Sequence, residues 1–302
     1  MESKRQENKI IRFENIRNNR NRKAKVMDKK RRKTPTRIIA ITSGKGGVGK
    51  TNIVANLGYA LSKTGNKVLI FDADLGLGNI DILLGITPQY NLSHVINGEK
   101  SISDIIVKGP ANLNILPASS GIQEMTGLSL DQRLEMLKDL DSVIDKYDIL
   151  LIDTAAGISS NVLHFNTSAN EIMVVVTPEP TSITDAYALM KILSLKYDEK
   201  DFKLIVNSAV TMDEAGDVFR QLNMVTNRFL DISIEYFGAI LLDDNVKKSV
   251  KQQKLVSELA PVCTASRSFA VLAKKISTLP PQVKTNWDRQ MDWAQMHMHR
   301  AD

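Results

Sequence analysis

Between Arg37 and Leu279, short apolar runs alternate with longer amphipathic stretches. The short runs are rich in Ile, Leu and Val without a regular polar position, which is typical of strands buried on both faces. These runs are Ile38–Thr42, Val68–Phe71, Leu113–Leu116, Ile149–Ile152, Ile172–Val176, Leu204–Val206 and Tyr236–Ile240. The helix-length stretches are Asn52–Lys63, Leu128–Lys146, Ser182–Leu195, Asp213–Phe229 and Ala265–Leu279. This alternation predicts an α/β fold with a mostly parallel central sheet of about seven or eight strands and helices on both faces.

The two ends of the chain differ from this middle part. Residues 1–36 contain 14 Lys and Arg against 4 Asp and Glu, whereas the whole chain of 302 residues contains 40 against 34. The excess positive charge therefore belongs to an N-terminal arm, whose few apolar residues predict disorder. Such an arm is either a solubilising segment or a binding segment for anionic lipid, nucleic acid or an acidic partner. We expect three parts: the basic arm 1–36, a folded domain 37–279 and a C-terminal tail 280–302.

The C-terminal tail begins where Pro280 and Pro281 stop the last expected helix. One face of a helix in the tail would carry Val283, Trp287, Met291, Ala294 and Met298. Such a stripe suits a peripheral membrane contact. The charges of the tail cancel, however, and it lacks the Lys-rich polar face of a good membrane anchor. We therefore expect docking on the folded domain or on a partner chain ahead of membrane contact.

Composition excludes several classes of protein. No run of about eighteen apolar residues predicts a membrane-spanning helix, and the polar N-terminus does not resemble a secretory signal. A single cysteine, Cys263, cannot form an internal disulfide or a cysteine cage for a metal. An iron–sulfur carrier that bridges two chains through several cysteines is disfavoured for the same reason. We expect a cytoplasmic protein.

The strongest chemical signal lies between the first apolar run and the first helical stretch. The chain there reads Gly44, Lys45, Gly46, Gly47, Val48, Gly49, Lys50 and Thr51, which fits the phosphate-binding P-loop pattern. The glycines let the backbone curl so that consecutive N–H groups face phosphate oxygens, and the following helix directs its positive end at the same place. Lys50 is expected to neutralise the β- and γ-phosphates of ATP, and the Thr51 hydroxyl to ligate Mg²⁺.

Two further apolar runs end in aspartates. Asp72 and Asp74 follow the run that begins at Val68, and Asp153 follows the run that begins at Ile149. Parallel sheets place their ligands beyond the carboxyl ends of the strands. Taken alone, Asp153 could equally cap the next helix. The order and spacing of the P-loop and the two aspartate-bearing runs favour a Mg-ATP site.

Lys45 is not required by an ordinary P-loop. With it, residues 37–279 resemble the deviant-Walker ATPases of the MinD/ParA class, a group of P-loop NTPases. The resemblance implies that the chain forms a homodimer with ATP and that Lys45 reaches across it to the partner's nucleotide. An added cation beside the γ-phosphate is what phosphoryl transfer requires. It also implies that Asp74 orients the attacking water and contacts Mg²⁺, and that Asp153 is the second magnesium-side aspartate.

Base recognition is expected further along the chain. Asn207 stands where members of the class read adenine. Gly157 stands where they supply an N–H group near the γ-phosphate. The class often has a proline two residues before an aspartate after the next strand, and here Leu241 replaces that proline before Asp243. This departure leaves the adenine contacts and the role of Asp243 open.

Two segments favour one group within the class. Residues 74–81, DLGLGNID, resemble the switch region of MinD-type proteins. Residues 178–187, PEPTSITDAY, and 207–210, NSAV, are similar to the flagellar-number regulators of the FlhG or FleN group. The resemblance implies an ATP-dependent switch that regulates flagellar number or placement, with an FlhF-type GTPase and flagellar components as partners.

Other functions of the same site stay open. A MinD-like division-site ATPase or a ParA-like partition ATPase would use the same catalytic residues with a different cargo. Retention on DNA through the basic arm that fails at moderate salt would favour partition. A scaffold that binds ATP without turnover is also open, since sequence does not report rates. A ligase or synthetase is disfavoured because no second substrate-specific cluster is evident.

Overall fold

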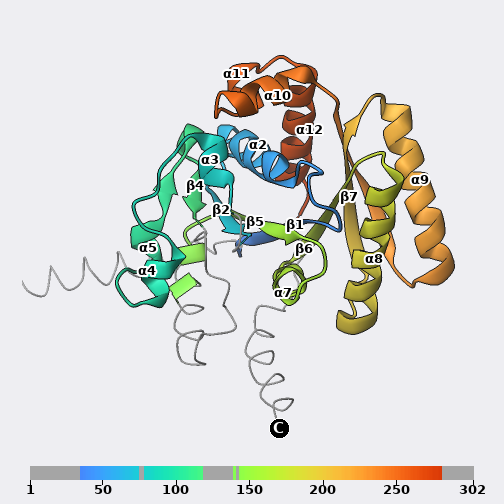
Figure 1. Cartoon of the computed structure of the whole chain (residues 1–302), viewed down its shortest axis with the longest axis horizontal. Coiled ribbons are helices and arrows are strands. Elements are labelled where there is room, and N and C mark those ends of the chain that lie inside the picture. Colours follow the sequence, from blue (N-terminus) through green and yellow to red (C-terminus); the bar gives the residue numbers. More distant parts are fainter. Residues whose placement is uncertain (1–34, 75–77, 118–138, 141–142, 281–302) are drawn as a thin grey trace, which may run out of the picture. The chain divides into compact units, whose positions relative to one another are not determined.

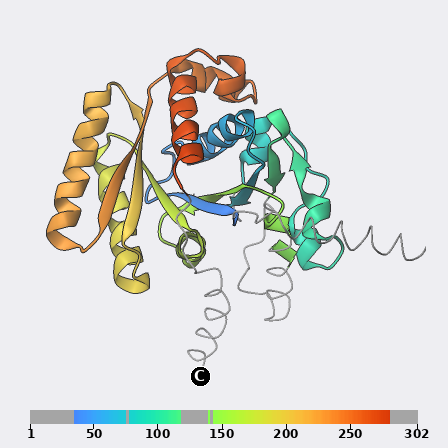
Figure 2. The same cartoon turned by 180° about the vertical axis from the view of Figure 1, so that it is seen from behind.

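The folded unit from Thr36 onward consists of one sheet between two layers of helices (Figures 1 and 2). The computed structural model describes residues 35–74, 78–117, 139–140 and 143–280. Within these ranges the strands are β1 Arg37–Ser43, β2 Val68–Ala73, β3 Val107–Lys108, β4 Asn114–Leu116, β5 Ile149–Ala156, β6 Glu171–Val176, β7 Asp201–Ala209 and β8 Ser233–Leu241. The arm before residue 35, the tail after residue 280 and most of the helix expected over Leu128–Lys146 lie outside the described residues.

Long and short helices connect the strands. The long ones are α2 Lys50–Lys63, α7 Ser160–Ser168, α8 Pro180–Tyr197, α9 Met212–Phe229, α10 Asp244–Lys251 and α12 Thr264–Thr278. The short ones are α3 Ile80–Leu84, α4 Leu92–Ile96, α5 Ile102–Ile105, α11 Val256–Leu259 and the 3₁₀ helix Pro110–Asn112. The expected helices that lie in the described ranges all occur, with ends shifted by at most two residues.

The strand order is β3-β4-β2-β5-β1-β6-β7-β8, and β3–β4 is the antiparallel pair in an otherwise parallel sheet. All seven expected strands are confirmed. β3 was not expected, because a two-residue strand that ends in Lys108 has no apolar run. Since β1 lies between β5 and β6, the chain moves to one side of β1 first and to the other side later. Ligands of open parallel sheets bind at the carboxyl ends of strands at such a reversal.

Both faces of the sheet are covered, as uninterrupted apolar runs predict. Ile39 and Ile41 of β1 belong to a core shared with α2 and α12, whereas Ile38 and Ala40 belong to a core on the opposite face. Figure 1 shows α2 and α12 together on one side of the sheet and α7, α8 and α9 on the other. The sheet therefore has no solvated face in its centre and exposes its strand ends instead.

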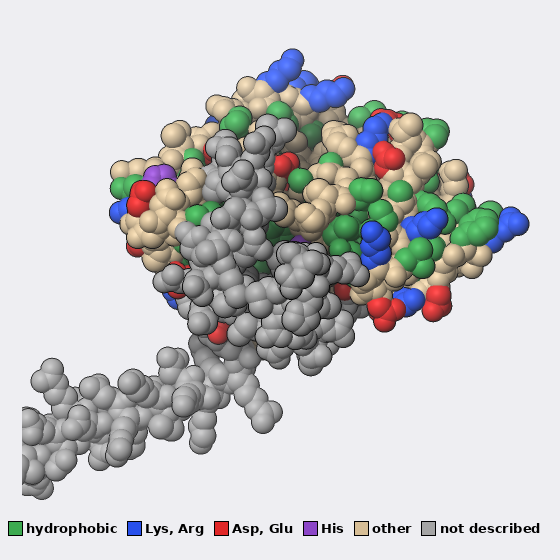
Figure 3. Space-filling model, turned by 60° about the horizontal axis from the view of Figure 1, so that its bottom comes forward, with side chains coloured by type: hydrophobic (Ala, Val, Ile, Leu, Met, Phe, Trp, Pro, Cys, Tyr) green, Lys and Arg blue, Asp and Glu red, His purple; other side chains and the backbone are tan. Residues whose placement is uncertain are grey.

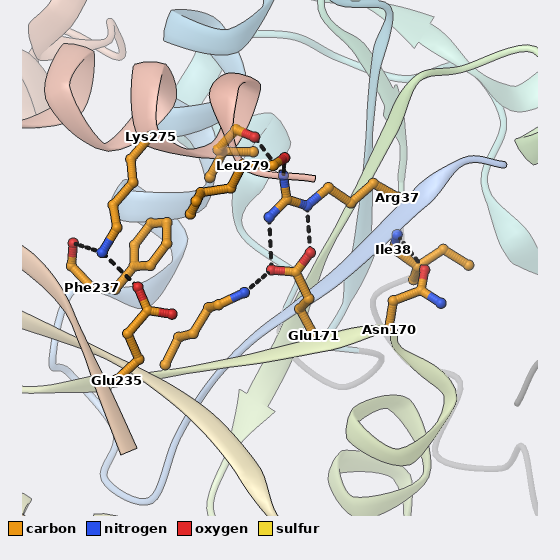
Figure 4. A network of polar contacts seen from close by, with 10 residues as sticks. Arg37, Ile38, Asn170, Glu171, Glu235, Phe237, Lys275 and Leu279 are labelled. Carbon is orange, nitrogen blue, oxygen red and sulfur yellow. Dashed lines mark hydrogen bonds and ion pairs between the residues drawn. The ribbon is translucent and has the colours of Figure 1, made fainter. Parts of the chain in front are cut away.

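A buried ionic network joins the amino ends of three strands to the end of α12 (Figure 4). Arg37 Nη2 lies 2.9 Å from Glu171 Oε2, and its Nε also contacts Glu171. Lys203 on β7 contacts the same carboxylate. Arg37 Nη1 donates to the backbone oxygens of Ile276 and Leu279, the latter at 3.1 Å. Arg37 thereby provides donors for the last carbonyls of α12 and fixes this helix against the sheet.

The charge of this network favours the ionised carboxylate. Burial alone would raise the pKa of Glu171, but hydrogen bonds from Arg37 and Lys203 outweigh burial and lower the pKa below its ordinary value. Beside the network, Lys275 on α12 lies 2.7 Å from Glu235 on β8, at a partly exposed position. Ion pairs therefore link the amino ends of these strands to one another and to α12.

The outer surface of α8 and α9 carries several exposed apolar side chains among Lys and Arg (Figure 3). The largest of them are Leu195, Met212, Met224 and Phe229. The inner face of α9, in contrast, buries Ala215, Val218 and Leu222 against the sheet. Among the helices that the structure describes, none is long and apolar enough to cross a membrane.

Candidate active site

The P-loop connects β1 to α2 at the carboxyl ends of the parallel strands. Two of its glycines are required by close neighbours: a Cβ atom at Gly44 would lie 2.1 Å from the backbone oxygen of Asp185, and one at Gly49 would lie 2.5 Å from Nδ2 of Asn207. Gly49 also has a φ of 87° as the N-cap of α2, a conformation that glycine adopts without steric cost. The loop is thus packed between α8 and the end of β7, and a larger residue at either of these two positions would clash with its neighbours.

A buried ion pair lies below the loop. Lys50 Nζ is 2.7 Å from Asp153 Oδ1, and both side chains are almost fully buried. The pair forms because β1 and β5 are neighbours and Ile41 is in register with Asp153. Burial raises the pKa of Asp153 above its ordinary value, although the Lys50 ammonium opposes this change. The structure therefore brings together the P-loop lysine and the aspartate that sequence analysis assigned to Mg²⁺.

A second buried carboxyl stands next to this pair. Asp72 on β2 is in register with Asp153 on β5. Its Oδ1 accepts from the backbone N–H of Asp74 at 3.3 Å, and its Oδ2 from that of Ile80 at 3.4 Å. Burial, followed by the negative charge of Asp153, raises the pKa of Asp72 to about 7. Carboxyl groups are therefore in excess here, since those of Asp72, Asp74 and Asp153 lie near the buried Lys50 ammonium.

This donor set fits Mg²⁺ together with phosphate. Across the described ranges, no cluster of three or more His, Cys, Asp or Glu side chains is arranged to hold a metal ion alone. Mg²⁺ is commonly bound by one or two carboxylates, waters and the phosphates of its substrate, because it gives up its waters reluctantly. The candidate ligands are Asp74, Asp153 and the Thr51 hydroxyl, which lies beside Asp153. The excess of carboxyl groups around Asp72, which raises its pKa, is the observation that favours a divalent cation.

An open cavity of about 460 Å³ lies above the ion pair. Its floor consists of P-loop and α2 residues, including Gly46, Gly47, Val48, Gly49, Lys50 and Thr51. Asp74 and Asn79 line one wall, which adjoins α3. A cavity of this size is within the range of small-molecule sites. Backbone N–H groups, an ammonium and carboxylates therefore surround one cavity. This combination of groups suits a polyphosphate with a bound metal ion.

Lys45 contacts the start of α8. Its Nζ contacts the Glu179 carboxylate and lies 2.8 Å from Oγ1 of Thr181, at the start of α8. The Lys45 side chain is about one third exposed. The extra lysine of the P-loop thus lies at the surface beside the cavity, held by residues of the same chain. Its reach into a second chain stays a prediction.

Asn207 and Gly157 make contacts with the backbone around the P-loop. Asn207 Nδ2 donates to the backbone oxygen of Val48 at 2.7 Å, so its amide supports the loop. The N–H group of Gly157 donates to the backbone oxygen of Ser43 at 2.9 Å. The expected roles of these residues toward adenine and the γ-phosphate stay predictions.

Asp243, whose role the sequence left open, caps a helix. Its carboxylate accepts from the backbone N–H of Asn245 at 2.9 Å and from that of Ala265 at 3.1 Å. Burial opposes ionisation, but these hydrogen bonds outweigh it and lower the pKa of Asp243 to about 2. Asp243 therefore joins the start of α10 to the start of α12.

Sequence analysis did not identify the wall of the cavity that faces the P-loop. Ile82 and Leu83 of α3, together with Val250 and Gln253 around the end of α10, line the same hollow. They lie far apart in sequence and belong to no motif. Their role becomes visible only in the structure, where Ile82, at 57% exposure, and Val250, at 38%, are apolar side chains that their helices do not bury.

Known proteins match this chain over most of its length. Residues 36–206 match the family described as an AAA domain. The chain is 43% identical over 246 residues to the antiactivator FleN of Pseudomonas aeruginosa, a match that covers 82% of this chain and 88% of FleN. It is 36% identical over 267 residues to the flagellum site-determining protein YlxH of Helicobacter pylori, covering 88% of this chain and 89% of YlxH.

Solved structures agree with these relatives. The cell division ATPase MinD of Pyrococcus furiosus has a TM-score of 0.68 and 26% identity, covering 81% of this chain and 99% of that one. The septum site-determining protein MinD of Pyrococcus horikoshii, solved with Mg-ADP, has a TM-score of 0.65 and 27% identity, covering 80% and 96%. With its P-loop, its paired lysine and aspartate and these relatives, the chain belongs to the AAA-domain family of P-loop ATPases, in the MinD-like group that includes FleN.

Proposed function

We propose that this ATPase is a dimerising switch that regulates the number or placement of flagella. The observation that carries the proposal is the 43% identity to FleN, which extends over 82% of the chain rather than over the P-loop alone. The similarity to YlxH, a flagellum site-determining protein, supports the same process. The chemistry that drives the switch is hydrolysis of Mg-ATP at the P-loop.

Each residue of the site has a proposed task. The substrate ATP would supply the γ-phosphoryl group, and bound Mg²⁺ would offset the charge that develops during its transfer to water. The backbone N–H groups from Gly46 to Lys50 hold the phosphates, and the Lys50 ammonium turns from Asp153 toward them. Asp153, Thr51 and Asp74 would hold the metal. Asp74 orients the attacking water and accepts its proton, which requires an ionised carboxylate beside the cavity.

Lys45 makes hydrolysis depend on a second copy of the chain. Its partners Glu179 and Thr181 lie at an exposed position, where an ion pair contributes little stability. We propose that Lys45 leaves them in an ATP-bound homodimer and stabilises charge on the partner's γ-phosphate. Loss of the γ-phosphate then removes the contact that joins the two chains, which releases the dimer. The nucleotide state thereby controls which surface the protein offers.

The proposed partners follow from this switch. They are an FlhF-type GTPase and flagellar components, with the protein acting in the cytoplasm or at the inner face of the cell membrane. Peripheral membrane contact through the tail 280–302 and nucleic-acid binding through the arm 1–36 are further proposals. Asn207 is proposed to read adenine as well as to support the P-loop.

A division-site or partition role is the second candidate. It is favoured by the MinD structures, which the fold matches over about four fifths of this chain. Such a role would use the same residues for ATP and differ only in cargo. Experiments in the cell can therefore distinguish the two candidate functions, whereas measurements on the active site cannot.

The deciding experiment is deletion of the gene in its source organism. Flagella per cell and their positions are counted by electron microscopy, after complementation with the wild-type gene or with Lys50→Ala. A changed count that the wild-type gene restores and Lys50→Ala does not restore supports the flagellar role. An unchanged count, with altered septum or nucleoid positions, would move the function to division or partition.

A further inference from the structure

The wall of the active-site cavity joins two distant parts of the chain. Asn79, the N-cap of α3, and Ile82 line the cavity together with Asp74. Val250 and Gln253, around the end of α10, line it from the other part of the chain. α10 therefore contributes to the surroundings of the proposed catalytic aspartate, although no motif of the P-loop class lies on it.

Gln253 stands in a backbone conformation that usually belongs to glycine. Its φ is 52°, and α10 ends through hydrogen bonds from Gln253 N to Val250 O at 3.0 Å and from Lys254 N to Ser249 O at 3.1 Å. Helices that end in this way commonly place Gly at the left-handed position. A residue with a side chain persists there only where its surroundings hold it, and such positions cluster at functional sites.

The Gln253 side chain has a specific contact. Its Nε2 donates to the backbone oxygen of Ile82 on α3 at 3.0 Å. Gly85, the C-cap of α3, makes the close approach possible: its φ is 62°, and a Cβ atom there would lie 3.3 Å from the Gln253 backbone oxygen. The ends of α3 and α10 therefore pack directly on each other, and the glutamine amide closes the contact.

The opposite end of α3 is held by the active site itself. The backbone N–H of Ile80 donates to the Asp72 carboxylate at 3.4 Å, and the backbone N–H of Asp74 donates to the same carboxylate at 3.3 Å. A displacement of α3 at its Gln253 end would therefore reach Asn79 through one short helix, and Asp74 through the Asp72 carboxylate that both segments contact. With only five residues, α3 has too few internal hydrogen bonds to keep its place alone.

We propose that Gln253 is a positioning residue for ATP hydrolysis, which holds α3, and with it Asp74 and Asn79, in place beside the P-loop. The inference rests on the ATPase site proposed above. Gln253 touches neither the P-loop lysine nor the reacting atoms in this role, because it acts through the backbone of Ile82. Glycine would adopt this φ without steric cost. The glutamine side chain instead supplies the hydrogen bond that orders the cavity wall formed by α3.

Substitution at this position separates positioning from simple stability. Gln253→Gly removes the amide and also relieves the left-handed conformation, so thermal stability is expected to be unchanged or higher. Turnover is nevertheless expected to fall about fivefold, which corresponds to one lost hydrogen bond, with the KM for ATP changed less than about twofold. Gln253→Glu keeps the length but cannot donate to Ile82, so it should lose turnover without gaining stability. Gln252→Gly, at the exposed neighbouring position, is the control and should retain turnover.

Amide hydrogen exchange, measured without nucleotide, tests the contact independently of hydrolysis. In Gln253→Gly, the amides of residues 80–85 are expected to exchange several-fold faster than in the unsubstituted protein and in Gln252→Gly. Unchanged exchange there would overturn the proposal, whatever the turnover. Faster exchange with unchanged turnover would overturn it as well, because α3 would then be free to move without consequence. Absence of turnover in the unsubstituted protein would instead refute the ATPase function, and the exchange result would still decide whether Gln253 holds α3.

Discussion

The two ends of the central sheet each bury a lysine beside a carboxylate, but they balance the charge in opposite ways. At the amino ends of the strands, the Glu171 carboxylate receives both Arg37 and Lys203, and the remaining Arg37 donors reach the carbonyls of α12. At the carboxyl ends, Asp153 receives Lys50, while the neighbouring Asp72 carboxyl accepts hydrogen bonds from the backbone N–H groups of Asp74 and Ile80. The first cluster holds two cations against one carboxylate, whereas the second holds more carboxyl groups than cations.

The pKa shifts express this difference. The cations around Glu171 outweigh burial and lower its pKa, whereas burial and neighbouring carboxylates raise the pKa of Asp72 to about 7. A saturated buried network contributes rigidity and a defined place for α12. An unbalanced network is a site where a further cation is stabilised, as at many ligand sites. Each cluster contains a buried lysine beside a carboxylate, so the ion pair alone does not distinguish them. The balance of cations and carboxyl groups around the pair distinguishes the structural site from the functional one.

Loss of Lys50 should have the largest effect on function. Lys50→Ala removes the ammonium proposed to bind the β- and γ-phosphates, so ATP affinity should fall below detection and turnover by on the order of 10³-fold. Calorimetric titration with Mg-ATP measures the binding. Lys63→Ala, an exposed position at the other end of α2, is the control and should bind as the unsubstituted protein does. Retained tight binding in Lys50→Ala would contradict the assignment of the site.

Loss of Glu171 should have the largest effect on stability. Glu171→Gln leaves Arg37 and Lys203 buried without a counter-charge, and breaking such a buried network costs about 3–5 kcal/mol of unfolding free energy. Urea unfolding measures this loss, and ATP affinity of the remaining folded protein should be unchanged. Glu235→Gln breaks a partly exposed pair with Lys275 and should cost less than about 1 kcal/mol. Equal losses in the two variants would mean that burial does not distinguish these ion pairs.

Asp74→Ala tests the functional cluster without removing the phosphate contacts. Binding of ATP should stay within a few-fold, whereas turnover should fall by about 10²-fold or more because no carboxylate orients the water. The variant should therefore accumulate as an ATP-bound dimer, which size-exclusion chromatography with light scattering detects. An Asp74→Ala protein that stays monomeric with ATP would refute the dimerising switch.

Much of the fold was predictable because the sheet is buried on both faces. Seven apolar runs correctly predicted seven strands. The P-loop is a run of consecutive residues and can be recognised without knowledge of the tertiary structure. The two-residue β3 and the short helices were missed, because four or five residues do not complete two helical turns and so show no periodicity. α7 and α10, with nine and eight residues, were not expected either, so element type was predicted for the buried strands and for the longest helices.

The contacts between distant residues were the part that sequence could not supply. Gln253 and Ile82 are 171 positions apart and meet only because α10 returns across α3. Lys203 carried a usable signal, since it interrupts a buried strand between Phe202 and Leu204 and therefore needs a partner. Its partner, Glu171, could not be named before the register of β6 and β7 was known.

The smallest expected effect, and the sharpest distinction between the two clusters, is the dependence of stability on pH. The folded protein holds a proton on Asp72 up to a pH of about 7, whereas the unfolded chain releases it near the ordinary value of 3.8. Between these two pH values the folded state binds more protons, so this group makes the unfolding free energy decrease as pH rises. Glu171 behaves in the opposite way: its contribution is present above its ordinary value of 4.5 and is lost as pH falls through its lowered pKa in the folded state.

Asp72→Asn removes the pH dependence of stability that is due to Asp72 and leaves the one that is due to Glu171. The amide keeps an oxygen that can accept from a backbone N–H but carries no charge. The stability of the variant relative to the unsubstituted protein should therefore increase between pH 5 and pH 8 by on the order of 2 kcal/mol. Urea unfolding at both pH values, with a chelator and without nucleotide, measures the difference. Glu171→Gln, under the same conditions, should lose stability at both pH values because its carboxylate is ionised at each. If Asp72→Asn gave the same change at pH 5 and pH 8, the carboxyl ends of the strands would not carry the excess negative charge that distinguishes them from the amino ends.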